Sequence, residues 1–324
     1  MKALLCKQLG PPEALVVEDV ADPVADPGEA VVDVHFAGLN FFDTLIIEGK
    51  YQVKPALPFS PGGEFSGIVS ALGAGVTGLR IGERVAGYSG YGAARQRIAC
   101  PVDRLTTLPA NLSFEKAAGL CVTYGTALHA LRQRAELRKG ETLAVLGAAG
   151  GVGIAAVEIG ALLGAEVIAC ASSPDKLEFA RKMGARHGVD YSAGGLKDEL
   201  KRLTNGNGVD VVFDPVGGEL TEAALRAMAW KGRLLVIGFA AGPIPKPPLN
   251  LVLLKGCDIR GVFWGDFIRR EAALHQSNLA EIFRWAADGA LSAHVQDIFP
   301  LEKAATALGL LASRKAQGKL LLRP

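Results

Sequence analysis

The arrangement of apolar and polar residues changes along the chain. Up to about residue 120, short apolar runs alternate with turns that contain Gly or Pro, and the runs lie at residues 29–40, 63–73, 82–90 and 94–101. Short strands bounded by turn residues are typical of a compact antiparallel β domain. We therefore expect the first part of the chain to form such a domain.

Between about Tyr124 and Gly261, the apolar runs alternate with helical segments instead. The predicted strands are residues 142–146, 166–171, 187–191, 209–214, 232–238 and 257–262, and the predicted helices are residues 151–163, 175–185 and 219–230. Strands that are buried on both faces and separated by helices form a parallel, doubly wound sheet. The elements expected after this sheet are a helix at 271–288, a short run at 294–300, a helix from Leu301 and a last strand from Lys319.

Composition narrows the class of protein. The chain has 324 residues, 49% of them hydrophobic and 21% charged, which indicates a globular protein of about two domains. A net charge of +2 and the absence of a Lys/Arg run argue against a nucleic-acid partner. No membrane span is expected, because Glu158 and Glu166 interrupt the longest apolar candidate. The first residues also lack the pattern of a signal peptide.

Cysteines and histidines bear on compartment and on metal binding. The five cysteines are odd in number, widely spread and without a Cys-x-x-Cys pair, a pattern that favours free thiols in a reducing cytoplasm. The five histidines are scattered as well, whereas a tetrahedral zinc site needs three or four ligands together. We predict a cytoplasmic protein with no metal.

A glycine-rich turn follows the predicted strand 142–146 and opens the next helix. The turn resembles Gly-x-Gly-x-x-Gly, with Ala148 at the first glycine position. Gly150 would let the backbone approach a pyrophosphate, and Gly153 would let the helix pack close to the strand. The predicted phosphate-binding residues are Ala149, Gly150, Gly151, Val152 and Gly153. The alternative is a glycine-rich turn without a ligand.

The end of the next strand indicates which dinucleotide binds. An NAD site usually has a carboxylate there, but this strand ends in Ser172, Ser173 and Pro174. Small hydroxyl residues leave room for a 2′-phosphate, and Lys176 supplies a positive charge. Asp175 follows Pro174 and is expected in the first helical turn. We therefore predict NADPH rather than NADH.

Several motifs, taken in order, carry a family resemblance. They are "GLNFFDTLIIEGKY" (38–51), "LPFSPGGEFSGIV" (57–69), "TYGTALHAL" (123–131), "GAAGGVG" (147–153) and "GKLLL" (318–322). Together they resemble the zinc-independent quinone oxidoreductases of the medium-chain dehydrogenase/reductase superfamily. The resemblance implies a GroES-like, mostly β catalytic domain at 1–123 and 264–324, a Rossmann domain at 124–263, and NADPH in the cleft between them.

The positions that hold zinc in the related alcohol dehydrogenases differ in this chain. Gly63 stands where those enzymes have histidine, and Glu64 follows it. Residues 38–40 contain no cysteine, and residues 88–100 contain a single one in place of a four-cysteine lobe. By resemblance, too, the chain is expected to bind no metal.

The resemblance also implies roles for single residues. Asn40, Asp43 and Tyr51 would be catalytic, with Tyr51 as proton donor as in the related enoyl-thioester reductases, and Thr126 would lie beside the nicotinamide ribose or carboxamide. The structural alternatives are that Asn40 shapes a turn, that Asp43 caps a helix, and that Tyr51 lines the pocket. Where relatives often have tyrosines this chain has Leu128-His129, a departure expected to affect the substrate pocket.

Three further cofactor contacts follow from the same resemblance. Tyr191 would stack on or bond to the adenosine 2′-phosphate, and Phe239 would lie near the nicotinamide. Lys319 would reach the phosphate from the last strand; the alternative for Lys319 is an exposed lysine in front of a β run.

Three functions remain open. The first is NADPH-dependent hydride transfer to quinones or to activated double bonds (enones), the second is reduction of enoyl thioesters, and the third is dinucleotide binding without catalysis.

For assembly, the apolar segment 247–264 contains the strand that should end the parallel sheet. An apolar edge invites pairing, so we expect a homodimer through this edge. The alternative is a local helix that covers the edge.

Overall fold

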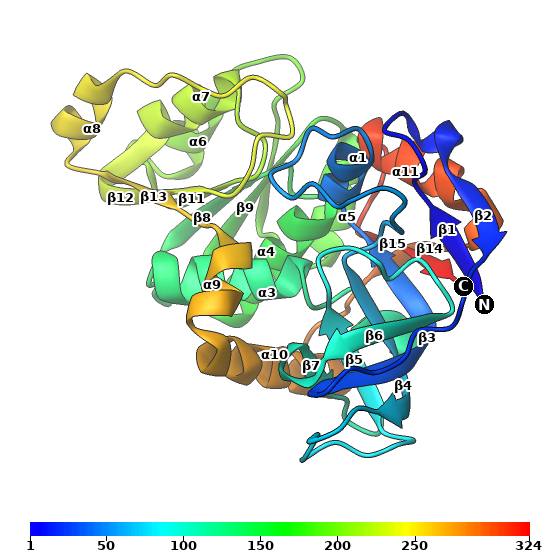
Figure 1. Cartoon of the computed structure of the whole chain (residues 1–324). Helices are drawn as coiled ribbons and strands as arrows, with labels where there is room; N and C mark the ends of the chain where they lie inside the picture. Colours follow the sequence, from blue (N-terminus) through cyan, green and yellow to red (C-terminus); the bar gives the residue numbers. More distant parts are fainter. The chain divides into compact units, whose positions relative to one another are not determined.

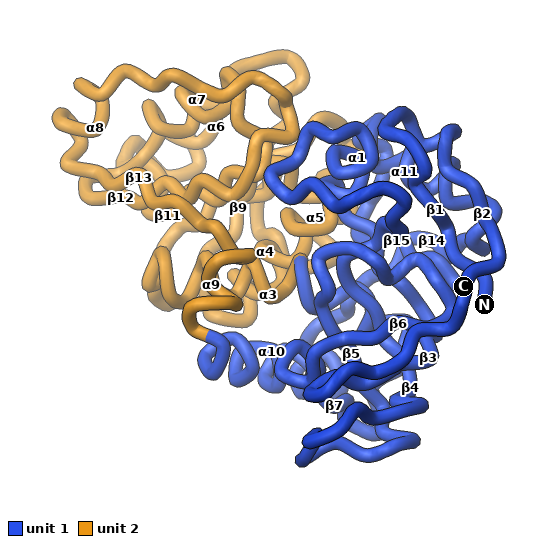
Figure 2. Tube along the Cα trace, viewed as in Figure 1, with its two compact units in different colours: residues 1–122, 272–324 blue, residues 123–271 orange.

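The computed structural model describes residues 1–324, which fall into two compact units (Figures 1 and 2). Unit 1 consists of residues 1–122 and 272–324, and unit 2 consists of residues 123–271. Unit 2 therefore ends later than the predicted boundary at Phe263. The reason lies in packing within unit 2, where the ring of Phe267 stacks on His129 with centroids 3.7 Å apart.

Unit 1 is built on a mainly antiparallel sheet with the strand order β14-β15-β3-β4-β5-β7, and β6 pairs with β3 outside this path. Within the sheet only β14 and β15 run parallel to each other. Two short strands form a separate antiparallel pair. The strands are β1 (Lys2–Leu5), β2 (Val16–Asp19), β3 (Glu29–Leu39), β4 (Glu64–Leu72), β5 (Arg84–Tyr88), β6 (Arg97–Pro101), β7 (Leu105–Thr107), β14 (Val295–Pro300) and β15 (Lys319–Arg323).

The helices of unit 1 are short apart from α10. They are η1 (Pro12–Ala14), α1 (Phe41–Ile47), η2 (Val102–Arg104), α2 (Phe114–Ala117), α10 (Ala272–Ala287), η4 (Leu301–Lys303) and α11 (Ala304–Ala312). One apolar core joins the sheet to α1 and α11, and Phe65 on β4 lies fully buried in it. The predicted β-rich character of the first part of the chain is confirmed.

Unit 2 contains a six-stranded sheet in the order β10-β9-β8-β11-β12-β13, with every pair parallel. The strands are β8 (Thr142–Leu146), β9 (Glu166–Ala171), β10 (His187–Asp190), β11 (Val209–Asp214), β12 (Met228–Val236) and β13 (Asp258–Gly261). The predicted bounds of β8, β9 and β11 are confirmed residue for residue. Their apolar runs are buried on both faces, which is the pattern that a helix-covered parallel sheet requires.

Helices lie on both faces of this sheet (Figure 1). They are α3 (Thr123–Leu128), the π-helix η3 (His129–Arg134), α4 (Gly151–Leu162), α5 (Pro174–Lys182), α6 (Leu196–Leu203), α7 (Glu219–Ala227), α8 (Leu249–Lys255) and α9 (Trp264–Arg270). The sequence prediction named neither α6 nor α8. Leucines of α6, α7 and α8 pack into one core with the strands, so tertiary burial accounts for these short helices.

Together, the two sheets confirm the predicted fold class, a GroES-like β domain and a Rossmann-type parallel sheet. None of the helices combines the length with the apolar sequence that a membrane span requires.

Candidate functional site

The residues predicted to bind a dinucleotide lie at one edge of the parallel sheet. Residues 149–153 follow the carboxyl end of β8, Ser172 follows β9, Tyr191 follows β10, and Phe239 comes soon after β12. In a parallel sheet these ends share an edge. β8 pairs with both β9 and β11, so the strand order reverses there, and ligands of open α/β sheets bind at such a point.

Backbone geometry explains the small residues of the first turn. Gly147 has a φ of +60°, which favours glycine. A Cβ on Gly153 would lie 2.2 Å from the Gly147 carbonyl oxygen, so α4 can pack this close only with glycine there. At Gly150 an added Cβ would meet only the same oxygen at 3.5 Å, which is ordinary contact. The protein's own packing therefore does not demand glycine at 150, and the open space fits a phosphate at the start of α4.

The turn after β9 brings the predicted 2′-phosphate residues together. Ser173 is the N-cap of α5 and accepts from the backbone N–H of Lys176. The Nζ atom of Lys176 lies 3.2 Å from the hydroxyl of Ser172, which is exposed. Asp175 lies in the first turn of α5, as the sequence predicts. A hydroxyl and an ammonium group thus lie side by side with no carboxylate between them.

The other residues of unit 2 that were predicted to contact the cofactor differ in how far they are exposed. Tyr191 is half-buried, and Phe239 is 40% exposed beside Gly217. Thr126 is buried on α3. Leu128 and His129, the residues that replace family tyrosines, are both buried, and burial lowers the pKa of His129.

Asp214, at the end of β11, is a residue that the sequence reasoning missed. It is buried, and its carboxylate accepts from the backbone N–H groups of Val216 and Gly217 at 2.9 and 2.8 Å and from the hydroxyl of Thr221 at 2.6 Å. These bonds fix the turn that leads from β11 to α7 at the same edge of the sheet. The signal was present in "VDVVFDPVGG", where a carboxylate ends a buried strand and glycines follow.

A buried polar cluster in unit 1 contains the predicted catalytic residue Asn40. β3 ends at Leu39, and α1 begins at Phe41, so Asn40 lies at the junction of strand and helix. The Nδ2 atom of Asn40 donates to Glu64 Oε1 at 2.9 Å, and Oδ1 of Asn40 accepts from Lys319 Nζ at 2.8 Å. We call Asn40, Glu64 and Lys319 the Asn40 cluster.

Asp43 supports this junction from the first turn of α1. Its carboxylate accepts from the backbone N–H of Asn40 at 2.7 Å and from that of Gly62 at 3.1 Å. Asp43 therefore has the helix-capping role that the sequence offered as an alternative. Since its side chain is fully buried, any effect on a substrate would be exerted through Asn40.

Lys319 requires a correction. The sequence offered a phosphate-binding residue or an exposed lysine, but its side chain is only 3% exposed. Its ammonium group donates to Leu39 O at 2.8 Å, to Asn40 Oδ1 and to Glu64 Oε1 at 2.7 Å. An ammonium group has three N–H bonds, so these partners occupy all of its donors. The lysine belongs to the Asn40 cluster, a placement that only the pairing of β15 with β3 reveals.

Tyr51 lies just beyond α1 and is half-buried. Its ring stacks on Phe42 with centroids 5.5 Å apart. Burial, and to a lesser degree the negative charge of Asp43, raises the pKa of the phenol. Tyr51 therefore keeps its proton at neutral pH, as a proton donor must.

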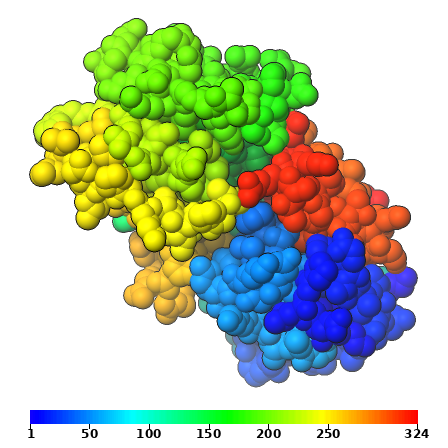
Figure 3. Space-filling model, turned by 90° about the horizontal axis from the view of Figure 1, so that it is seen from above, coloured from blue at the N-terminus to red at the C-terminus, as the bar shows by residue number.

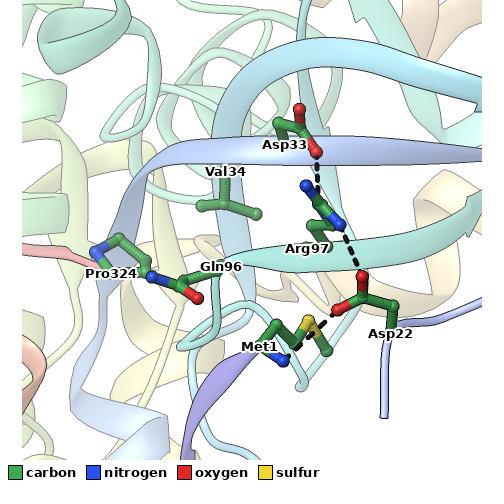
Figure 4. A pocket seen from close by; sticks show the side chains of 7 residues that line it. All are labelled: Met1, Asp22, Asp33, Val34, Gln96, Arg97 and Pro324. Carbon is green, nitrogen blue, oxygen red and sulfur yellow. Dashed lines mark hydrogen bonds and ion pairs between the residues drawn. The ribbon is translucent and has the colours of Figure 1, made fainter. Parts of the chain in front are cut away.

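The distinct pocket in Figure 4 lies elsewhere on unit 1. It has a volume of about 460 Å³, and it is lined by Met1, Asp22, Asp33, Val34, Gln96, Arg97 and Pro324. Arg97 bridges Asp22 and Asp33 at 2.5 and 2.9 Å, and the terminal amine lies 3.3 Å from Asp22. These charges neutralise one another, and no predicted site residue lines the pocket.

Comparison with known proteins identifies the family. Residues 26–111 match the alcohol dehydrogenase GroES-like domain, and residues 151–280 match the zinc-binding dehydrogenase domain. The chain is 40% identical to quinone oxidoreductase-like protein 2 of Rattus norvegicus over 322 residues. This match covers 99% of this chain and 91% of the rat protein. The chain belongs to the zinc-independent quinone oxidoreductase family of the medium-chain dehydrogenase/reductase superfamily.

Two further members of this family extend the likeness. The quinone oxidoreductase of Pseudomonas aeruginosa is 34% identical over 317 residues, 97% of each chain. A structure of the Escherichia coli quinone oxidoreductase complexed with NADPH aligns with a TM-score of 0.92 and 30% identity over 100% of both chains. The family resemblance found in the sequence is confirmed.

One of the two matching domains is the zinc-binding dehydrogenase domain, and the residues of this chain do not fit that metal. No group of three His, Cys, Asp or Glu side chains is placed to hold a metal ion. Gly63, which stands at the position of the alcohol dehydrogenase histidine, has no donor atom in its side chain. A zinc ion therefore has no part in the chemistry proposed below.

Asp43 generates a prediction about pH. Burial raises the pKa of its carboxyl from 3.8 to about 7, against the opposing effects of its backbone hydrogen bonds and Lys319. The folded protein then holds this proton more tightly than the unfolded chain, so the contribution of Asp43 to stability falls as pH rises between these values. Relative to Asp43→Asn, the wild type should lose free energy of unfolding from about pH 4 to about pH 7 in urea titrations. A pH-independent difference would contradict the raised pKa.

Proposed function

We propose that this protein is an NADPH-dependent, zinc-independent oxidoreductase that reduces quinones or the carbon–carbon double bonds of enones. The observation that carries the proposal is the Asn40 cluster, a set of buried polar groups in a quinone oxidoreductase fold that lacks metal ligands. The complex of the Escherichia coli relative with NADPH supports the cofactor. Five buried, unpaired cysteines support a reducing cytoplasm as the compartment.

Unit 2 supplies the residues that would hold NADPH. The turn 149–153 and the first N–H groups of α4 would bind the pyrophosphate, and Ser172 and Lys176 would bind the 2′-phosphate. Tyr191, Phe239 and Thr126 would contact the rest of the cofactor. When bound, NADPH supplies the hydride for the reaction.

Unit 1 supplies the polar groups for the substrate. Hydride addition to an enone or a quinone builds negative charge on the substrate oxygen, and a fixed donor stabilises such charge. The Nδ2 group of Asn40 is such a donor, and Asp43 holds the backbone at Asn40 in place. The phenol of Tyr51 would then deliver the proton that completes the reduction of an enone.

A test of the cofactor uses Lys176. NADPH should bind roughly 10- to 100-fold more tightly than NADH, since a charge-assisted contact to phosphate contributes about 1.5–3 kcal/mol. Lys176→Ala should remove most of this preference and leave NADH binding unchanged, as measured by fluorescence titration. Lys182→Ala, at the far end of the same helix, is the matched control and should keep the preference. Equal affinities of the wild type for the two dinucleotides would refute the assignment.

A test of the activity uses Tyr51. The wild type should turn over members of a quinone panel and an enone panel with NADPH. Tyr51→Phe should lower kcat on enones by about 10²-fold, because the proton donor is lost. The quinone reaction of the same variant is the internal control, since a reduced quinone oxyanion is stable enough to take its proton from water. NADPH affinity should change little.

Other outcomes of the same assay separate the alternatives. An enoyl-CoA panel is therefore added to the assay. Turnover confined to that panel would favour the enoyl-thioester reductase, an alternative that the protonated phenol of Tyr51 also supports. NADPH binding without turnover of any panel would leave only the non-catalytic dinucleotide-binding protein. If kcat of Tyr51→Phe is unchanged on every substrate, Tyr51 only lines the pocket and does not donate the proton.

We also propose a homodimer through the edge of the parallel sheet at 247–264. β13 ends the sheet, and Ile259 on it is exposed. On α8, Leu251 packs into the core, whereas Leu249, Leu253 and Leu254 are 75%, 79% and 69% exposed. Residues around 240–256 lie on the surface of unit 2, in yellow in Figure 3. Exposed apolar side chains on α8, together with Ile259 on the open edge strand, favour contact with a second copy.

Light scattering tests the assembly. At micromolar concentration the protein should have about twice the chain mass of 33.8 kDa. Ile259→Asp combined with Leu253→Asp should give a monomer, because the charges would be buried at the interface. Ile81→Asp is the matched control, an isolated apolar residue on unit 1 that is 66% exposed, and it should leave the dimer intact. A wild-type monomer, or a double variant that still dimerises, would rule out this interface.

A further inference from the structure

The side-chain amide of Asn40 is held between two groups of opposite hydrogen-bonding character. Its oxygen faces the ammonium group of Lys319, which can only donate, at 2.8 Å. Its nitrogen faces the carboxylate of Glu64, which when ionised can only accept, at 2.9 Å. Turning the amide over would oppose donor to donor and acceptor to acceptor. The orientation of Asn40 is therefore fixed by its neighbours.

The two charged groups are in turn fixed by the sheet. Lys319 is the first residue of β15, Glu64 is the first residue of β4, and both strands pair with β3 just before Asn40. The second oxygen of Glu64 accepts from the backbone N–H of Val122 at 2.9 Å. Both charges are buried, and a buried charge is stable only with such complete pairing.

Two glycines make room for this pair. A Cβ on Gly38 would lie 2.7 Å from Cγ of Glu64 and 2.3 Å from the carbonyl oxygen of Ala118. A Cβ on Gly119 would lie 3.0 Å from Cγ of Lys319. Neither glycine has a positive φ, so backbone conformation does not explain them. The close approach of Glu64, Lys319 and the carbonyl group of Ala118 does.

One hydrogen on Nδ2 of Asn40 is left over. Glu64 takes one of the two, and no acceptor in the protein takes the other. The amide oxygen, in contrast, is occupied by Lys319. Asn40 can therefore offer a ligand a hydrogen-bond donor, the remaining N–H of its Nδ2 group.

We infer that Lys319 and Glu64 are positioning residues that lock Asn40 with its free N–H toward the substrate, so that the site selects a ligand oxygen that gains negative charge. This inference rests on the proposed function, in which a carbonyl or quinone oxygen develops that charge. The pair acts through Asn40 and does not itself touch the substrate.

Steady-state kinetics and thermal unfolding of three variants test the inference. Lys319→Met keeps the length of the side chain but removes the donor to Asn40. It should lower kcat by roughly 10²-fold on quinones and enones, close to the lower end of what the loss of a fixed oxyanion donor costs. The Kd of NADPH should change less than about twofold. Asn40→Ala should show a similar loss of kcat, since it removes the donor that Lys319→Met leaves without a fixed orientation.

Stability must be separated from orientation, because Lys319→Met leaves Glu64 buried without its cation and will lower Tm. The double variant Lys319→Met/Glu64→Gln removes both charges, and replacing a whole buried pair is often close to neutral for stability. It should regain most of the lost Tm while kcat stays low. Arg233→Met/Glu141→Gln, which removes a largely buried ion pair of unit 2, is the matched control and should leave kcat unchanged.

The outcomes distinguish this inference from the proposed function. If kcat returns with Tm in the double variant, or if Lys319→Met keeps the wild-type kcat while Asn40→Ala loses it, the pair is structural only and the inference is overturned. If Asn40→Ala is fully active, the role of Asn40 in the proposed function fails, and the inference fails with it. If the wild type turns over no substrate of any panel, the proposed function itself is refuted.

Discussion

Burial of the Lys319–Glu64 ion pair is the constraint on which the structure of unit 1 depends. Two charges removed from water are tolerated only if every donor and acceptor finds a partner. Here the partners come from the end of β3, the start of β4, the start of β15 and the backbone at Val122. The last strand of the chain is therefore tied to the first part of unit 1 at the position where Asn40 begins the turn into α1. Removing either charge would leave the other unpaired, so the two residues act as one unit.

The parallel sheet imposes a different constraint, which is geometric. Because all its strands run the same way, the segments that follow them meet at one edge, and the reversal of strand order at β8 opens space there. Close packing of α4 on Gly147 then requires glycine at 153. Asp214 orders the neighbouring turn through backbone N–H groups. Small residues and one buried carboxylate thus shape a surface suited to a phosphate.

The two units therefore contribute different chemistry. Unit 2 offers backbone amides, Ser172 and Lys176, which suit an anionic cofactor. Unit 1 offers a buried amide with fixed orientation and a tyrosine that retains its proton. Neither unit gathers metal ligands. A reduction in which fixed polar groups stabilise charge on a substrate oxygen is the chemistry that such a set of residues supports.

Local patterns in the sequence were enough to predict the strands β8, β9 and β11, the glycine turn, and the position of Ser172 and Lys176 directly after β9, because each depends on neighbouring residues and on the period of burial. The family resemblance, too, was carried by short motifs. Packing decided other features: α6 and α8, which the sequence prediction did not name, are short helices held by a shared core, and residues 264–271 join unit 2 through contacts such as that of Phe267 with His129. The role of Lys319 could not be found from sequence at all. Asn40 and Lys319 are separated by almost the whole chain, and only the antiparallel pairing of β15 with β3 brings the ammonium group to the amide, since hydrogen bonds depend on distance in space and not along the chain.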